Sequence, residues 1–366
     1  MDFRFTQEQD EAAELAASIL ADRVTNDRLK AVEAAGDRFD RDLWAELGSS
    51  GLLGLALPEQ YDGAGLGLIE LCRVLVEVGR TVAPVPLAFH GPAARVIAEL
   101  GSDEQKQRWL PGAASGATVL TAAVAEDRAW APVRPTTVAT PDGDGFRLTG
   151  SKAVVPAGPY ADLFLVPAET PAGVSVFLVE PGDEGVTVVT QTYSDGDGVA
   201  RLDLDGARLG PDRELAGADA RLRQLLVLCG AAEQLGITEG ALRLTSSYAK
   251  TREQFGRPIG TFQAVSQRLA DGYIDVLGQR LTLWQAAWRL DEGLPADSEV
   301  AIAKLWAADA GHRLAHTTVH VHGGVGIDLD GEAHRYFTSG KRFEFLNGGA
   351  TEQALNVGRI LAAEPA

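Results

Sequence analysis

The sequence predicts an α+β protein in which a helical segment, a compact β domain and a second helical segment follow one another. Up to about Ala117, apolar residues recur at spacings of three and four, as on one face of a helix. From about Thr118 to Ala216 the sequence pattern changes to short runs rich in β-branched residues, separated by turn residues. After Gly217 the helical spacing returns and holds to the C-terminus. We therefore expect three domains, at residues 1–117, 118–216 and 217–366.

The N-terminal helices are predicted from two amphipathic stretches. "TQEQDEAAELAASILADRV" begins at Thr6, and "IELCRVLVEVGRTV" begins at Ile69. Both place apolar residues three and four positions apart, which gives a helix one buried face. Segments rich in proline and glycine at 58–67 and 84–92 predict loops between the helices.

The predicted sheet is followed by three long helical runs. The strands are expected at "ATVLTAAVA", "TTVAT", "FRLTG", "ADLFLVPAE", "GVSVFLVE", "GVTVVTQ" and "ARLDLDG", with turns at 142–145 and 181–185. The helical runs begin at Ala218, Phe262 and Ala296.

Composition excludes several classes of partner. The chain carries 33 Lys and Arg against 51 Asp and Glu, a net charge of -18. Such a surface repels phosphate backbones and anionic lipids, so we expect neither a nucleic-acid nor a membrane partner. Cys72 and Cys229 lie far apart in apolar runs, as expected of buried thiols in a reducing compartment.

The N-terminus is acidic and amphipathic rather than basic and then apolar, as a signal peptide would be. No uninterrupted apolar run reaches the roughly 20 residues of a membrane span. We therefore expect a soluble, cytoplasmic protein.

A cation and an aromatic ring stand at a break between two predicted helices, in "YAKTREQFGRPIGTFQ". Arg252 ends one helix, and Phe255, Gly256 and Pro258 interrupt the chain before the next helix begins. A planar, permanent cation on such a loop suits a diphosphate. The structural alternative is an ordinary interhelical turn with an arginine–carboxylate pair.

A second candidate is "HVHGGVGI", residues 320–327. Adjacent glycines allow a phosphate or ribityl chain to approach the backbone closely, although glycine pairs more often end helices. No strand precedes them, so they are not the glycine-rich fingerprint of a dinucleotide-binding βαβ unit.

Three histidines recur every four residues on one helical face, at His312, His316 and His320. That spacing could hold a metal ion. No acidic or cysteine partner is spaced to complete the ligand set, so a histidine stripe on an interface helix is the simpler interpretation, and we predict no metal.

Glu233 differs from the other acids because its neighbours at helical spacing in "LLVLCGAAEQLG" are apolar or small. Burial there would raise its pKa toward the range of a general base. The alternative is a buried glutamate that pairs with an arginine across a helix contact.

Together these stretches resemble the acyl-CoA dehydrogenase family over nearly the whole chain. "GLLGLALPEQYDGAGLGLIEL" is similar to the family's "PEEYGGAG" loop, "YAKTREQFGRPIGTFQ" to its most recognisable signature, and "HVHGGVGI" to its "FGGNGF" flavin loop. The resemblance implies a barrel-like antiparallel sheet domain between an N-terminal helical domain and a C-terminal four-helix bundle.

The resemblance also implies an enzyme that binds FAD between the β domain and the C-terminal helices and oxidises an acyl-CoA at Cα and Cβ. In the family, the Arg and Phe of "REQFG" contact the FAD of a neighbouring subunit, so an oligomer is expected. The positions that correspond to the family's cofactor contacts are Arg252, Gln254, Phe255, Gln263, His320, Gly323 and Gly324. At position 320 the family has glutamine.

The family's catalytic base is missing at its usual place. Most members carry it as the Glu of "YEGT", which corresponds without gaps to Asn347 in "FLNGGATEQALNVGR". An amide cannot accept a proton at neutral pH. A minority carries the base on the helix before "REQFG", at the position of Leu226, which is equally inert. Glu233 lies two helical turns later on the same face, so it is our candidate base.

The segments that face the flavin ring in the family are also altered. The family's "TEPGAGSD" loop is reduced to "AAVAEDRAWAP", and its "W-I-T" corresponds to Val154, Val155 and Pro156. Pro156 has no backbone N–H to donate. The contacts that a subunit lends to its neighbour are thus kept, whereas those that it uses itself are weakened.

This asymmetry indicates one partner of a heteromeric enzyme, similar to the α2β2 acyl-CoA dehydrogenases of actinobacterial steroid side-chain catabolism. We expect a subunit that acts on a bulky or branched acyl-CoA, in a homo- or hetero-tetramer with a paralogous chain, and passes electrons to an electron-transfer flavoprotein. The alternative is a non-catalytic subunit that completes the FAD site of a catalytic partner.

Overall fold

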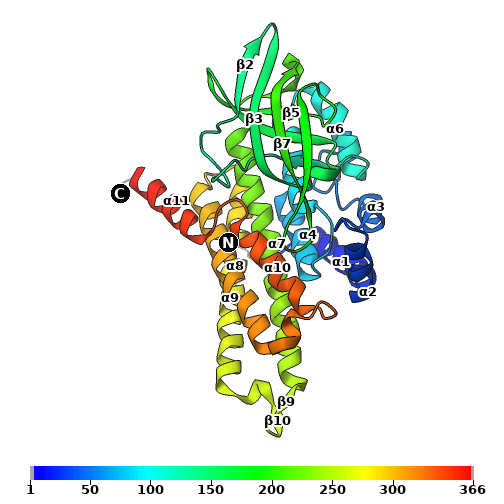
Figure 1. Cartoon of the computed structure of the whole chain (residues 1–366), viewed down its shortest axis with the longest axis vertical. Coiled ribbons are helices and arrows are strands. Elements are labelled where there is room, and N and C mark those ends of the chain that lie inside the picture. The colour runs from blue at the N-terminus through cyan, green and yellow to red at the C-terminus, as the bar shows by residue number, and fades with distance from the viewer. Residues whose placement is uncertain (1–3, 364–366) are drawn as a thin grey trace. The chain divides into compact units, whose positions relative to one another are not determined.

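A computed structural model describes residues 4–363 of the chain. Its element order confirms the predicted succession of helices, sheet and helices (Figure 1). The described residues form two compact units. The first comprises residues 4–31, Cys72–Ala83 and 230–363, and the second comprises Val32–Leu71 and Pro84–Cys229. The chain changes from helix to strand between residues 115 and 120, and from strand back to helix between residues 215 and 219. The division into three domains stays a prediction.

The sheet belongs to the second unit. Its strands are β1 (Leu120–Ala122), β2 (Val138–Asp142), β3 (Gly145–Pro156), β4 (Leu163–Thr170), β5 (Gly173–Val179), β6 (Val186–Thr192), β7 (Gly198–Leu209) and β8 (Glu214–Leu215). They lie in the order β6-β7-β3-β2-β4-β5-β8, with β1 beside β4. All seven predicted runs form strands, and β8 is an eighth that the sequence did not indicate.

The implied barrel-like, antiparallel sheet needs correction. Most neighbours are antiparallel, but β4 pairs in parallel with β1 and with β2. Within the described residues β6 and β8 end the sheet and do not pair, so it stays open. The reason is physical: β8 has only two residues, and β6 is a mostly exposed Thr- and Gln-rich edge whose backbone water can satisfy.

The core of this unit lies on the central strands. The side chains of Leu148, Val155, Phe164, Phe177 and Leu202 are completely buried. Burial of each such side chain is worth about 1.5–3 kcal/mol, which holds β3, β4, β5 and β7 together.

A buried carboxylate anchors the loop between β1 and β2. Glu126 accepts hydrogen bonds from the backbone N–H and hydroxyl of both Thr136 and Thr137, at 2.6–3.0 Å. The Lys152 ammonium on β3 donates to Glu126 Oε1 at 2.8 Å and to the carbonyl oxygen of Pro167 at 2.7 Å. Burial alone would raise the pKa of Glu126, but Lys152 and Thr136 outweigh it and lower the pKa to about 2.

The remaining helices of this unit are α3 (Arg41–Ser49), α5 (Leu87–Leu100) and α6 (Asp103–Ser115). The predicted loop at 84–92 is wrong from Leu87 on, because α5 begins there and includes Pro92. All of residues 87–94 are buried, and this burial outweighs the backbone hydrogen bond that proline forfeits.

His90 on α5 is a fully buried link between three elements. Its Nε2 lies 3.1 Å from the carbonyl oxygen of Ala113, its Nδ1 accepts from the Leu120 N–H at 3.1 Å, and its ring meets Trp44 edge-on. Burial lowers the pKa of His90 to about 4, so the ring is neutral at pH 7.

Acid is therefore expected to destabilise this unit through His90. In the unfolded chain His90 has an ordinary pKa of 6.5, so it binds a proton more readily there than in the folded chain. The stability that the neutral His90 ring contributes is therefore fully present above pH 6.5 and is lost as the pH falls through 4. The loss is on the order of 3 kcal/mol. Urea unfolding of wild type and His90→Gln at pH 7.5 and 4.5 measures it. Equal pH dependence in both proteins would contradict this assignment.

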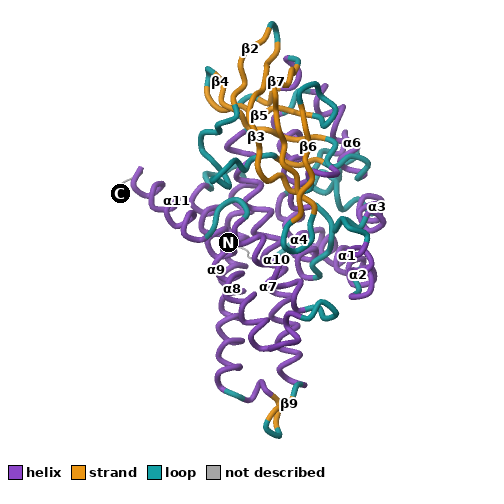
Figure 2. The backbone as a smooth tube through the Cα atoms, in the orientation of Figure 1, coloured by secondary structure: helices purple, strands orange, loops and turns teal. Residues whose placement is uncertain are grey.

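The first unit is helical. Apart from the parts of α2 (Asn26–Ala34), α4 (Leu68–Arg80) and α7 (Asp219–Thr251) that it contains, its helices are α1 (Gln7–Arg23), α8 (Gln263–Asp291), α9 (Asp297–His322), α10 (Ala333–Phe345) and α11 (Ala350–Ala363). Figure 2 shows α8 and α9 side by side, and α10 and α11 pack on α9. A two-residue strand pair, β9 (Glu253–Gln254) and β10 (Arg257–Pro258), connects α7 to the short 3-10 turn before α8.

Helices α4 and α7 touch backbone to backbone within this unit. A Cβ added to Gly236 would collide with the carbonyl oxygen of Val76, and one added to Gly79 would collide with that of Glu233. A Cβ on Gly240, one turn further along α7, would meet Tyr336 and the Arg80 carbonyl. Only glycine permits this approach, which fixes the position of the α7 turn that carries Glu233.

Helix α7 is long and apolar enough to cross a membrane by length and composition alone. However, 83% of its most apolar 18-residue window is buried inside the protein, as in the core helix of a soluble protein.

Candidate functional site

The "REQFG" segment forms an exposed hairpin at the end of α7 (Figure 1). Phe255 and Gly256 turn the chain with φ of 54° and 76°. The Ile259 N–H donates to the Arg252 carbonyl at 2.8 Å and closes the base of the hairpin. The Phe255 ring is 92% exposed, and its ring contact within residues 4–363 is a T-shaped one with Phe262. The sequence thus displays a large aromatic ring in solvent, where the chain itself gains nothing from it.

The cation beside this ring is also exposed. Among residues 4–363 the Arg252 guanidinium has no carboxylate partner, so the arginine–carboxylate pair of the structural alternative does not form. The Gln254 amide donates to the neighbouring Glu253 carbonyl at 2.7 Å. Gln263 is the exposed first residue of α8.

The second predicted segment lies next to the first. Helix α9 ends at His322, and Gly323 (φ 65°) turns the chain into the 3-10 segment Gly323–Ile327. The His322 ring stacks on Tyr248 at 4.3 Å, one helical turn before Arg252. His320 is exposed. The structure therefore brings the two predicted cofactor segments together at adjacent ends of α7 and α9.

The glycine pair leaves open space. Nothing in the described chain lies within 4 Å of the Cβ positions of Gly323 and Gly324. A free cation, an exposed ring and an uncovered glycine turn on one end of the bundle fit a ligand that has a diphosphate and an aromatic ring.

Glu233 is buried, and an arginine faces it. Its Oε1 lies 4.0 Å from Nη2 of Arg342 on α10, and both side chains are almost fully shielded from solvent. The contact is the one that the structural alternative for Glu233 expected; its role as a base stays a prediction.

Asn347 lies beside the same stretch of α7. A Cβ on Gly230, three residues before Glu233, would stand 3.9 Å from Asn347 Nδ2. Asn347 has φ 59°, a conformation that asparagine tolerates better than most residues, and the Gln353 amide donates to its carbonyl at 2.9 Å. Asn347, at the position predicted for the family's base, thus lies beside the turn of α7 that leads to the candidate base Glu233.

Lys304 is a positioning residue that the sequence reasoning missed. Its buried ammonium donates to the carbonyl oxygens of Phe343 (2.7 Å) and Glu344 (3.2 Å) and so holds the end of α10 that leads to Asn347. Burial lowers the pKa of Lys304 to about 7, against the raising effect of Glu344 and Glu352. The sequence did contain a signal for Lys304: it is a charged residue in the apolar run "VAIAKLW", just as Glu233 is a charged residue among apolar neighbours in its own helix.

The residues expected near the flavin ring are wholly or partly buried within the protein. Val155 and Pro156 are buried, and Val154 is half-buried and bridged to Ala125. The Pro156 carbonyl accepts from the Thr121 hydroxyl at 2.7 Å. Leu226, the minority base position, is buried as well.

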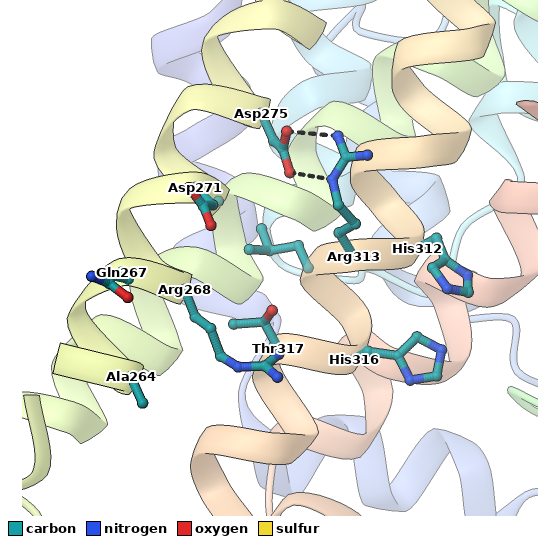
Figure 3. A pocket seen from close by; sticks show the side chains of 11 residues that line it. Ala264, Gln267, Arg268, Asp271, Asp275, His312, Arg313, His316 and Thr317 are labelled. Atoms are coloured by element: carbon teal, nitrogen blue, oxygen red, sulfur yellow. Dashed lines mark hydrogen bonds and ion pairs between the residues drawn. The ribbon is translucent and has the colours of Figure 1, made fainter. Parts of the chain in front are cut away.

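The histidine stripe does not assemble a metal site in the described part of the chain, where no group of three or more His, Cys, Asp or Glu is placed to hold one. His312 Nδ1 instead lies 3.1 Å from Glu344 and 2.9 Å from Lys341 Nζ. His312 and His316 line a pocket of about 550 Å³ between α8 and α9, together with Arg268 and Arg313 (Figure 3). Burial, and then the charges of His312 and Lys341, lower the pKa of His316.

Two family profiles match the chain. "Acyl-CoA dehydrogenase, N-terminal domain" covers residues 6–117, and "Acyl-CoA dehydrogenase, C-terminal domain" covers residues 228–362. The chain belongs to the acyl-CoA dehydrogenase family of oxidoreductases, as its sequence indicated. This membership supports FAD as its cofactor.

Similar proteins cover the whole chain. Acyl-CoA dehydrogenase FadE27 of Mycobacterium tuberculosis is 46% identical, with 100% of both chains aligned. A chain of the ChsE4–ChsE5 complex from the same organism superposes with a TM-score of 0.96 at 46% identity over 100% of both chains. A chain of the Tcur3481–Tcur3483 steroid ACAD superposes with a TM-score of 0.94 at 42% identity over 98% of each.

Proposed function

We propose that this chain is a subunit of an FAD-dependent acyl-CoA dehydrogenase, and that it completes the FAD site of a paralogous partner that supplies the catalytic base. One observation carries this proposal: the buried acid near Asn347, Glu233, faces Arg342, while Asn347 stands at the position where we predict the family's base. Neither arrangement suits the removal of a proton from a carbon acid.

Residues at the end of the bundle would hold the nucleotide. Arg252 offers a permanent cation to the diphosphate, the Phe255 ring offers a face to an aromatic group, and the open turn at Gly323 and Gly324 lets a ligand approach the backbone. Bound FAD supplies the acceptor for the substrate's Cβ hydride. Because these residues point away from their own chain, they suit a flavin that another subunit holds.

The substrate and the acceptor follow from the proposed partnership. A thioester of a bulky or branched acid, such as a steroid side chain, is supported by the two-chain ChsE4–ChsE5 complex and by the Tcur3481–Tcur3483 steroid ACAD, both similar to this chain. We propose a cytoplasmic α2β2 tetramer that transfers its electrons to an electron-transfer flavoprotein.

A second candidate function is a fully catalytic subunit with Glu233 as its base. The observation in its favour is that Glu233 is a buried acid near Asn347, the position that we predict for the family's base. A substrate seated one turn further along α7 would meet it.

The decisive experiment compares variants in the co-expressed assembly. Arg252→Ala is expected to weaken FAD binding about 10- to 100-fold, because a charge-assisted bond to the diphosphate is lost. The control Arg147→Ala removes an exposed arginine from β3 and should leave FAD content unchanged. Flavin absorbance after gel filtration measures both. FAD binding unaffected by Arg252→Ala would exclude the proposed contact.

Glu233→Gln separates the two candidate functions. Bleaching of the flavin by acyl-CoA should persist in this variant if the partner supplies the base. Loss of bleaching in an assembly that keeps its FAD and its melting temperature would instead assign the base to Glu233. Stoichiometric FAD and turnover in a homo-oligomer of this chain would refute the non-catalytic role.

A further inference from the structure

The last turn of α10 is capped by a side chain from another helix. The last four carbonyl oxygens of a helix need partners outside it. In α10 the carbonyls of residues 342 and 345 accept from backbone N–H groups of the turn that follows, at 3.2 and 3.1 Å. The carbonyls of Phe343 and Glu344 between them accept from Nζ of Lys304 on α9, at 2.7 and 3.2 Å. Lys304 thus completes the end of α10 from outside the helix.

The turn between α10 and α11, residues 346–349, is strained and is held in place by both of its neighbours. Asn347 and Gly348 have positive φ, 59° and 96°, and a non-glycine residue persists in this region only where its surroundings enforce it. Gln353 on α11 braces one side, because its side-chain amide donates to the Asn347 carbonyl at 2.9 Å. Lys304 braces the other side through the end of α10. A strained segment that depends on such braces opens more readily than the helices beside it.

The buried site around the Lys304 nitrogen matches a neutral amine better than an ammonium ion. Lys304 is only 2% exposed, and its Nζ donates to two carbonyl oxygens. Among residues 4–363 it forms no ion pair and has no third acceptor. A neutral amine has two N–H groups, whereas an ammonium ion has three. A protonated Lys304 would therefore bury an unpaired N–H and a full charge, which costs free energy.

The charged groups that act on Lys304 come from α10 and α11. One is Glu344, whose carboxylate is also bound by Lys341 and lies near His312. The other is Glu352, which is exposed. Within the described residues neither α7 nor α8 contributes such a group. Burial lowers the pKa of Lys304 from 10.5 to about 7, against the raising effect of the two carboxylates. The surrounding charge is thus too weak to keep the buried amine protonated above neutral pH.

We propose that the α10–α11 turn closes and opens with the release and uptake of one proton by Lys304. In the closed turn Lys304 is a neutral amine that donates to the two α10 carbonyls; in the open turn it is an ammonium ion in water. The turn carries Asn347, whose Nδ2 lies 3.9 Å from the Cβ position of Gly230 on α7, so opening withdraws Asn347 from α7. This equilibrium belongs to the chain itself and needs no FAD, so it holds or fails independently of the proposed function.

Acid is therefore expected to open the turn. In the open state Lys304 has its ordinary pKa of 10.5, and in the closed state burial lowers that pKa to about 7. The open state thus binds the proton more readily, and each unit by which the pH rises between 7 and 10.5 favours the closed turn about tenfold. Below pH 7 both states are protonated and above pH 10.5 both are neutral, so the dependence disappears.

Hydrogen exchange of the backbone amides in the turn tests this linkage in the full chain co-expressed with its partner. The protection factor, which is corrected for the chemical exchange rate, should rise about tenfold per unit from pH 7 to 9 in wild type. In Lys304→Met no amine titrates, so the protection factor should not depend on pH. Lys250→Met removes an exposed lysine from α7 and should keep the wild-type slope. A protection factor independent of pH in wild type, or the same slope in Lys304→Met, would overturn the proposal.

A second variant leaves Lys304 in place and changes only its surroundings. Glu352→Gln removes an exposed carboxylate that raises the pKa of Lys304, so the pH at which protection begins to rise should move downward. Glu14→Gln, which changes an exposed acid on α1, should leave that pH unchanged. An unchanged pH in Glu352→Gln would refute the assignment to Lys304, even if Lys304→Met does not fold. Flavin absorbance of the same samples reports separately on the proposed function.

Discussion

Replacing Lys152 by methionine is expected to lower the free energy of unfolding by about 3–5 kcal/mol, because it leaves the Glu126 carboxylate buried without its cation. Lys152 is completely buried, and its ammonium is shared between Glu126 and the Pro167 carbonyl. Methionine fills the volume but donates no hydrogen bond. Equilibrium urea denaturation of the purified chain measures the loss.

The matched control is Arg147→Met on the same strand. Arg147 pairs with Asp142 at 2.8 Å, but both side chains are well exposed, and such pairs contribute about 0–1 kcal/mol. The double variant Lys152→Met/Glu126→Gln should recover part of the loss, since the neutral amide tolerates burial better. Equal losses at positions 152 and 147 would show that burial does not decide the strength of these pairs.

Gly236→Ala is expected to destabilise the protein by about 3 kcal/mol or more, although alanine is the better helix former. The new methyl group would meet the Val76 carbonyl on α4, and because the obstacle is backbone it cannot rotate away. Helices α4 and α7 would have to separate along the whole crossing. The same variant should shift the turn of α7 that carries Glu233.

Gly358→Ala on α11 is the control for this substitution. Nothing lies within 4 Å of its Cβ position, so the change should stabilise the chain by about 0.5–1 kcal/mol through helix propensity alone. Thermal unfolding followed by circular dichroism compares the two variants. A stabilising effect at both positions would mean that the α4–α7 contact is looser than described.

The order of helices and strands could be predicted from the sequence because the textures that distinguish them are local. Every predicted strand run forms a strand, and the long helices begin within a few residues of their expected starts. The pairing of strands could not be predicted in the same way. The three-residue β1 pairs in parallel with β4 through Leu120 and Leu163, a contact between distant segments that leaves no periodic signal. The helical course of α5 through Pro92 was missed because burial, not propensity, decides it.

The same distinction between local sequence patterns and contacts between distant segments applies to the candidate site. A charged residue in an apolar helix shows in the sequence, so Glu233 could be found, but its neighbour Arg342 comes from a different helix and only the tertiary structure reveals it. The stack of Tyr248 on His322 is a similar case. Both residues lie in quoted motifs, yet nothing in their spacing shows that these motifs meet.

The conformation of the hairpin at the end of α7 affects the free energy with which a ligand or a subunit binds to it. Phe255 is a bulky residue with positive φ, a conformation that costs about 1–3 kcal/mol and persists only where the surrounding chain enforces it. Here the strand pair and the Arg252–Ile259 bond enforce it before any ligand or subunit arrives. The ring and the cation are preorganised, so association loses little conformational entropy in ordering them, and their affinity is set by contacts rather than by folding.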